Sequence, residues 1–204
     1  MYKLPFSDMA YTHHLWRRKY MAKEKSQTWE WIKAIVVAVV LAAVIRHFLF
    51  APILVDGVSM MPTLHNRDRM IVNKLGYNLG EPKRFDIIVF RATEDKDYIK
   101  RVIGLPGDRI EYKNDVLYVN GKAYEEPYLE TYKKQVTEGS LTYDFTLEEV
   151  TGARTVPKGQ LFVMGDNRRF SKDSRTIGTI SMDQVIGKAN IVYWPIKDAR
   201  VVGK

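Results

Sequence analysis

Residues 55–64 read VDGVSMMPTL and directly follow the only long apolar run of the chain. Ser59 lies between an extended stretch and the turn-forming Pro62. Gly57 allows close approach of other backbone, and Pro62 fixes its own φ while favouring an extended conformation at Met61. This pattern can hold a serine hydroxyl rigidly. An ordinary turn serine is the alternative, because serine is common beside proline in turns.

The apolar run is residues 31–50, WIKAIVVAVVLAAVIRHFLF. Twenty helical residues span about 30 Å, the thickness of the hydrocarbon core of a bilayer. Trp29 and Trp31 lie where an interfacial aromatic belt is expected, and Lys33 and Arg46 lie where their side chains can reach the interface. A buried core helix is rarely apolar all round, and a cleavable signal peptide seldom has about thirty residues before its apolar region. We therefore expect a transmembrane anchor over residues 31–50.

The net charge of +8 is concentrated at the N-terminus, since residues 1–50 carry +5 and residues 51–204 only +3. The positive-inside rule predicts that residues 1–30 form a cytoplasmic segment and that residues 51–204 face the outside. Met21 offers an alternative, shorter start. No second apolar run of comparable length follows, which predicts a single-pass protein of the cell membrane. The balanced charge of the outer part argues against a nucleic-acid partner.

Beyond the anchor, β-branched and aromatic stretches alternate with turn signals, which predicts a mainly β domain with coiled or closed sheets. Residues 51–108 and 157–204 are expected to form this catalytic β domain. Residues 109–156 are expected to be an inserted hairpin or small β subdomain, because Asn120-Gly121 is a strong hairpin signal and residues 125–156 are polar with weak periodicity. The expected strands are residues 52–58, 69–74, 85–90, 98–103, 109–112, 116–119, 160–164 and 188–194.

The chain contains no cysteine and four histidines. The absence of cysteine excludes a catalytic thiol nucleophile and a zinc site with cysteine ligands. Of the histidines, His13 and His14 fall in the cytoplasmic segment, His47 lies at the end of the anchor, and only His65 is in the outer domain. Histidines this scattered predict no metal site, and nothing suggests an organic cofactor. A histidine base for Ser59 therefore has one candidate in the outer domain. His65 is six residues from Ser59 across a proline turn, an awkward route for its side chain back to the serine hydroxyl.

Lysine is the remaining candidate base for a nucleophilic serine. A lysine base must be neutral near pH 7, so burial has to lower its pKa by about two to three units. Lys100 in YIKRVIG lies within an apolar strand pattern, as do Lys74 in MIVNKL and Lys188 in IGKANIV. Strand alternation alone does not choose among the three, and each could instead face the solvent.

Three motifs occur in order along the chain: VDGVSMMPTL, YIKRVIGLPGD over residues 98–108, and FVMGDNRRFSKDSR over residues 162–175. In sequence and spacing they resemble the motifs of the bacterial type I signal peptidases, or leader peptidases. The resemblance extends from about Trp31 to Trp194. The single anchor and the short insertion are similar to the Gram-positive branch of that family.

The resemblance implies roles for individual residues. It makes Ser59 the nucleophile and Lys100 the general base, and it makes Ser171 the serine that orients the lysine. Asp173 and Arg175 would brace the site by ion pairing, with Arg101 as the expected partner, and Gly165, Asp166 and Asn167 would form the turn that carries this wall. Val55, Asp56, Leu64 and Ile99 would form substrate pockets. Gly57 stands where Gram-negative members have a second serine, so only backbone N–H groups, at Ser59 and Gly57, are expected to stabilise an oxyanion.

The implied function is a membrane-bound serine endopeptidase that removes signal peptides from translocated secretory preproteins after small residues, as in Ala-X-Ala. The substrate is expected to add a strand to an exposed sheet edge. Two alternative interpretations of the sequence assign these residues to other kinds of protein. A self-cleaving repressor-type protease would need a DNA-binding domain, for which residues 1–30 are too short. A non-catalytic anchored β domain would leave Lys100 solvated and away from Ser59.

Overall fold

The structure is a computed structural model that describes residues 27–44, 50–74 and 80–202. The N-terminal part of the expected cytoplasmic segment and the end of the expected anchor, residues 45–49, lie outside these ranges, as do His13, His14 and His47. The chain divides into two compact units, residues 1–47 and residues 48–204.

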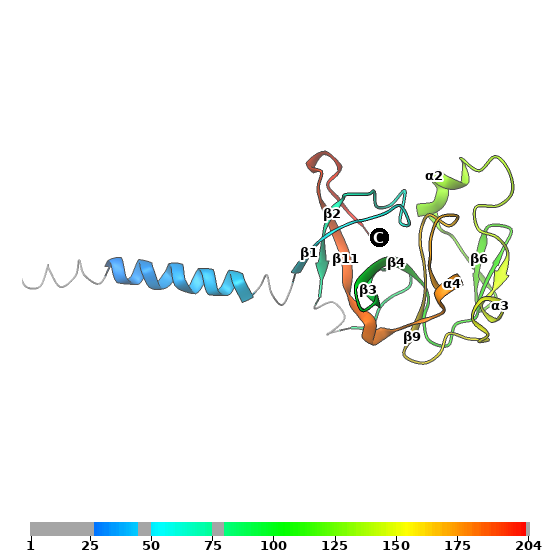
Figure 1. Cartoon of the computed structure of the whole chain (residues 1–204), viewed down its shortest axis with the longest axis horizontal. Helices are drawn as coiled ribbons and strands as arrows, with labels where there is room; N and C mark the ends of the chain where they lie inside the picture. Colours follow the sequence, from blue (N-terminus) through cyan, green and yellow to red (C-terminus); the bar gives the residue numbers. More distant parts are fainter. Residues whose placement is uncertain (1–26, 45–49, 75–79, 203–204) are drawn as a thin grey trace, which may run out of the picture. The chain divides into compact units, whose positions relative to one another are not determined.

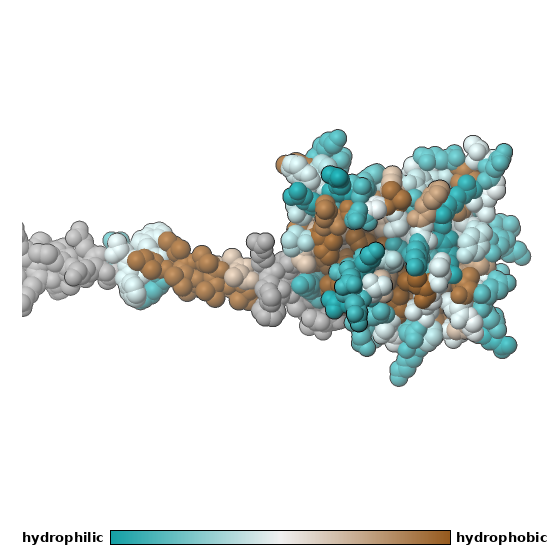
Figure 2. All heavy atoms as spheres, in the orientation of Figure 1, coloured by the Kyte–Doolittle hydropathy of each residue, from teal (hydrophilic) through white to brown (hydrophobic). Residues whose placement is uncertain are grey.

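Within the first unit, the described residues form a helix over Gln27–Val44. It is long and apolar enough to cross a membrane, and its apolar side chains are exposed along its length (Figure 2). At its polar beginning Lys33 forms an ion pair with Glu30 at 2.9 Å. The helix has the composition expected of the anchor but begins four residues before residue 31, and Phe50, expected to end the anchor, begins the first strand of the second unit.

The second unit is mainly β, as the sequence predicts, and contains two antiparallel sheets (Figure 1). The larger sheet has the strand order β1-β2-β11-β3-β4-β9-β10, with β12 pairing to β11. Its described strands form an open path with β1 and β10 at the ends. The strands are β1 Phe50–Leu54, β2 Arg69–Asn73, β3 Ile87–Thr93, β4 Lys96–Gly104, β9 Gln160–Met164, β10 Ile180–Ser181, β11 Val185–Trp194 and β12 Arg200–Val201.

The smaller sheet has the order β7-β6-β5-β8 and lies within the segment expected to be an insertion. Asn120 and Gly121 make the turn between two of its strands, both with positive φ. Short helices fill the polar stretch around residues 125–156 and follow β9, where no regular pattern was apparent in the sequence. The elements are β5 Ile110–Lys113, β6 Val116–Val119, β7 Lys122–Tyr124, β8 Phe145–Thr146, η2 Pro127–Leu129, α2 Glu130–Lys133, α3 Leu147–Thr151, α4 Ser174–Ile177, η3 Met182–Gln184 and η4 Ile196–Asp198.

Strands β3 and β4 form the centre of the large sheet. Residues 87–90 and 100–104 are buried in succession, so both faces of these strands are covered. One apolar cluster lies against β1, β2 and β11, another lies on the opposite face beside β10, and a third joins the end of β4 to the small sheet. Register shifts in β3, β4 and β11 interrupt regular pairing, and such bulges increase the local twist of a sheet. Lys100, the expected base, is thus carried by the buried half of β4.

Candidate active site

Ser59 lies on a loop that is fixed at both ends. The Val55 N–H donates to Asp68 O at 2.8 Å, which ties the start of the loop to the turn before β2. Farther along, Leu64 N–H donates to Met60 O at 2.9 Å, and both of these side chains are buried. Gly57 has a φ of +102°, a conformation that side-chain-bearing residues rarely adopt. These restraints hold the Ser59 hydroxyl in one place.

Lys100 reaches this hydroxyl from the middle of β4. Its Nζ lies 2.8 Å from Ser59 Oγ and 3.0 Å from Ile99 O. The lysine is 4% exposed, and no carboxylate in the described part of the chain forms an ion pair with it. Burial lowers the pKa of Lys100 from 10.5 to about 8, and the charges of Asp173 and Asp166 limit the decrease. A buried amine with this pKa is neutral often enough to accept a proton near neutral pH.

The other candidate bases lie elsewhere. Lys188 forms an ion pair with Asp86 and does not contact Ser59 in the described structure. Lys74 follows the end of β2, and His65 is exposed and uses its backbone N–H to bind Asp68. Of the candidate bases that the structure describes, Lys100 is thus the one that it places against the serine.

The turn after β9, residues 165–167, packs directly on the serine loop. Asn167 N–H donates to Ser59 O at 3.0 Å, and its side-chain amide donates to Val58 O at 3.1 Å. A Cβ atom on Gly165 would lie 2.4 Å from Ser59 O and 2.2 Å from Ser171 Oγ. Only glycine fits this contact, so the expected wall of the site depends on backbone-to-backbone packing.

The ion pairs of the wall differ from the expectation. Arg101 was expected to join the ion pairing of Asp173 and Arg175, but it forms a two-point ion pair with Asp166, at 2.8 and 2.6 Å. Asp173 instead pairs with Arg175 two residues later, at 2.8 Å. The reason is local: Asp173 is the N-cap of α4, so Arg175 in the first turn lies within reach of its carboxylate.

Asp173 also supports the turn, because it accepts the Gly165 N–H at 3.0 Å. Burial would raise the pKa of Asp173, but Arg175 and these hydrogen bonds lower it. Ser171 Oγ is buried beside Gly165, and no hydrogen bond joins it to Lys100 in the described structure. Its expected role in orienting the lysine stays a prediction.

A cavity of about 350 Å³ opens beside Ser59 and Lys100. Residues 53–60, Val89 and residues 97–100 line it. Val55, Asp56 and Ile99 line it, as expected, whereas Leu64 is completely buried in the core and does not. Sequence reasoning missed Phe170 and Lys172, which also line it; both lie in the quoted third motif, but no pattern there singles them out.

The backbone N–H of Ser59 has no acceptor among the described residues and can serve an oxyanion. The Gly57 N–H does not fit the expected role, since it donates to Asn66 Oδ1 at 3.0 Å. No group of three or more potential metal-ligating side chains occurs in the described ranges.

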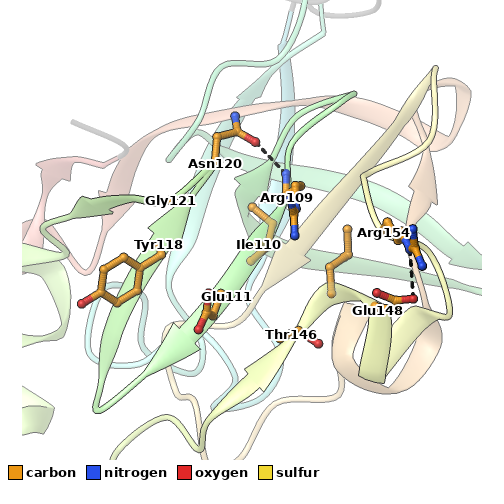
Figure 3. A pocket seen from close by; sticks show the side chains of 10 residues that line it. Arg109, Ile110, Glu111, Tyr118, Asn120, Gly121, Thr146, Glu148 and Arg154 are labelled. Carbon is orange, nitrogen blue, oxygen red and sulfur yellow. Dashed lines mark hydrogen bonds and ion pairs between the residues drawn. The ribbon is translucent and has the colours of Figure 1, made fainter.

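A second cavity, of about 390 Å³, lies on the small sheet beside α3 (Figure 3). The side chains labelled there include both cationic and anionic groups. Two of them, Arg154 and Glu148, form an ion pair at 3.3 Å. It shares no lining residue with the cavity at Ser59. The two cavities are therefore separate sites on the second unit.

The family described as "Signal peptidase, peptidase S26" matches residues 28–194, which include part of the first unit, most of the second and every residue of the site. The chain belongs to this family. The resemblance to the bacterial type I signal peptidases is thereby confirmed, and the chain is a serine-type peptidase of the signal peptidase family.

Relatives of this signal peptidase family match most of the chain. "Signal peptidase I" of Bacillus caldolyticus is 54% identical over 175 residues, which cover 86% of this chain and 94% of the relative. "Signal peptidase I T" of Bacillus subtilis (strain 168) is 48% identical, with 88% and 92% covered, and "Signal peptidase IB" of Staphylococcus aureus is 42% identical, with 85% and 93% covered. Among solved structures, the crystal structure of a signal peptidase I from Enterococcus faecalis V583 matches with a TM-score of 0.51 and a sequence identity of 45%. The match covers 53% of this chain and 97% of the chain in that crystal structure.

Proposed function

We propose that the protein is a membrane-anchored serine endopeptidase in which Ser59 and Lys100 form a catalytic dyad that removes signal peptides from secretory preproteins. The single observation that carries the proposal is the 2.8 Å contact between Ser59 Oγ and the buried Lys100 Nζ. The names of the relatives supply the substrate class, since they are signal peptidases.

In this mechanism neutral Lys100 accepts the Ser59 proton while Oγ bonds to the carbonyl carbon of the scissile peptide. The Ser59 N–H stabilises the oxyanion. The C–N bond then breaks, and the protonated lysine gives its proton to the leaving amine. Water next attacks the carbonyl carbon of the acyl-enzyme while Lys100 accepts one of its protons. The bond between that carbon and Ser59 Oγ then breaks, Lys100 returns the proton to Oγ, and the signal peptide leaves with a new carboxyl terminus.

The sheet edges at the cavity support binding of an extended substrate. Strand β4 pairs with β3 along residues 96–101, but it pairs with β9 only from Arg101 onwards. Its stretch Asp97–Ile99 thus has a free edge among the described strands, opposite the loop that follows β1. A substrate strand that binds there would direct alternate side chains into the cavity. We expect a cavity of this size, lined by Val55 and Ile99, to favour small residues such as the alanines of Ala-X-Ala.

The expected anchor places the enzyme at the bilayer, with the N-terminus in the cytoplasm and the second unit on the extracytoplasmic face. The helix Gln27–Val44 and the charge of residues 1–30 support this topology. The site requires no cofactor for this mechanism, since the proton acceptor and nucleophile are both side chains of the chain.

The test is cleavage of a preprotein with an Ala-X-Ala junction by the detergent-solubilised full-length protein. Wild type is compared with Ser59→Ala and Lys100→Ala, and circular dichroism checks that each variant is folded. We expect cleavage after the second alanine by wild type and none by either variant. Appreciable cleavage by folded Lys100→Ala would exclude the lysine base.

A further inference from the structure

The turn that supports Ser59 is held from behind by the buried side chain of Arg168. Its Nε donates to Gly165 O at 3.0 Å, and its own carbonyl accepts from Arg175 Nη2 at 2.8 Å. The guanidinium group is inaccessible to solvent. A cation buried this deeply requires an anionic partner, because desolvation strongly disfavours an unpaired charge.

The anion that meets this requirement is Glu126, which precedes η2 in the segment expected to be an insertion. Arg168 Nη2 lies 2.6 Å from Glu126 Oε1, and the carboxylate is 1% exposed. The hydroxyl groups of Tyr112 and Tyr128 donate to the same oxygen, at 2.8 and 2.6 Å. Burial would raise the pKa of Glu126, but Arg168 and these hydroxyl groups lower it, so the pair is ionised.

A second connection runs from the same segment to the strand that carries the lysine. The ring of Tyr128 stacks on the guanidinium group of Arg101, with 3.8 Å between the guanidinium carbon and the ring centre. Arg101 follows Lys100 in β4 and pairs with Asp166 of the supporting turn. Thus Glu126 and Tyr128, two residues apart, contact the two arginines that hold the turn.

We infer that Glu126 and Tyr128 are positioning residues for the Ser59–Lys100 pair, acting through Arg168 and Arg101. The inference rests on the proposed function and assigns a role in it to the segment 109–156. Neither residue lines the cavity at Ser59, so their inferred role is to position the pair and not to bind a substrate in that cavity. They fix the turn 165–167, whose other side binds the backbone of Ser59.

Loss of the Glu126 carboxylate would leave Arg168 buried without its counter-ion, and the turn would shift toward solvent. Lys100 would then be less buried and its amine more easily protonated. The groups that face Lys100 are the carboxylates of Asp173 and Asp166 and the ring of Tyr98. None of these side chains is replaced in a Glu126 variant, although Asp166 lies in the turn and would move with it. The rate should therefore fall, and the midpoint of its rise with pH should move to a higher pH.

The experiment compares Glu126→Gln with Asp108→Asn in the full-length detergent-solubilised protein. Asp108 is a matched control, because it is also a buried carboxylate paired with an arginine, Arg84, at 2.8 Å, but it does not contact the turn 165–167. For each variant, kcat and KM for an Ala-X-Ala preprotein are measured across pH and corrected for the folded fraction.

We expect Glu126→Gln to lower kcat about tenfold or more, and to move the midpoint up by about half a pH unit or more, with a smaller change in KM. Asp108→Asn should keep the wild-type midpoint even where it is equally destabilised. A wild-type midpoint and kcat in folded Glu126→Gln would overturn the inference and leave the residue a purely structural role.

Tyr128→Phe provides a second measurement if Glu126→Gln does not fold. It removes one hydroxyl donor from Glu126 while the ring stays on Arg101. We expect a smaller shift in the same direction, and an unchanged midpoint would overturn the inference. Failure of the proposed function is distinguishable, because it would appear as an inactive wild type or a fully active Lys100→Ala.

Discussion

Replacing Lys100 with methionine should abolish cleavage and make the folded protein more stable at neutral pH. Methionine has a similar length and suits a buried position, but it carries no charge. Lys100 is 4% exposed, so the folded state bears a desolvation cost whenever the amine is protonated. The reasoning predicts that a group required for activity reduces stability.

The pKa of Lys100 gives the magnitude. It falls from 10.5 to about 8 on folding, and each pKa unit corresponds to about 1.4 kcal/mol, so the cost is about 3 kcal/mol. Below pH 8 the lysine is charged in both states, and the folded state bears the full cost. Between about pH 8 and 10.5 the unfolded state binds more protons, so the wild-type free energy of unfolding rises with pH relative to the variant. Above that window the cost is gone.

The assay is chemical unfolding of wild type and Lys100→Met in the same detergent, at several pH values from 7 to 11. We expect the advantage of the variant to shrink by about 3 kcal/mol across this range. Contributions that do not titrate cancel in the comparison. Parallel stability curves would show that Lys100 has an ordinary pKa in the folded protein and would refute the reasoning.

The pKa of Lys100 also predicts that kcat/KM of the wild type rises about tenfold from pH 7 to pH 9. The neutral fraction of a group with a pKa of about 8 rises over that range from about one-tenth to about nine-tenths, and a flat pH profile would contradict the prediction. Gly165→Ala should lower kcat/KM about 100-fold or more, because its Cβ would collide with Ser59 O and Ser171 Oγ, and full activity would contradict the contact. Gly57→Ala should lower the free energy of unfolding by about 1–2 kcal/mol through its φ of +102° alone, since nothing lies within 4 Å of the added atom. His65→Ala should leave kcat/KM unchanged, and a loss of several orders of magnitude would revive a histidine base.

Much of the fold could be predicted from local sequence signals. The twenty-residue apolar run predicts the helix found over Gln27–Val44, and β-branched stretches predict β2, β4 and β9 to within two residues. Such signals are local, because the side chains of one strand or helix share one environment. The stretch 125–156 was harder to interpret, since its elements are four residues long or shorter, apart from α3 with five, and depend on tertiary contacts.

The ion pairs of the site could not be predicted in the same way. Asp166, Asp173, Arg101 and Arg175 are all visible as charged residues in the motifs, yet their pairing follows from the start of α4 and the register of β4 with β9. Glu126 gave no signal at all. It lies in an acidic loop and resembles a solvated residue until the packing of the small sheet buries it against Arg168.

The sequence by itself determined the membrane-compatible helix, the mainly β class and the candidate residues Ser59 and Lys100, because periodicity, composition and motif order are properties of the chain. Only the tertiary structure decided how closely Lys100 approaches the serine, which carboxylate neutralises which arginine and which residues line the cavity. Those properties depend on distance and burial, and residues separated by 41 positions, such as Ser59 and Lys100, come within 2.8 Å only when the sheet forms.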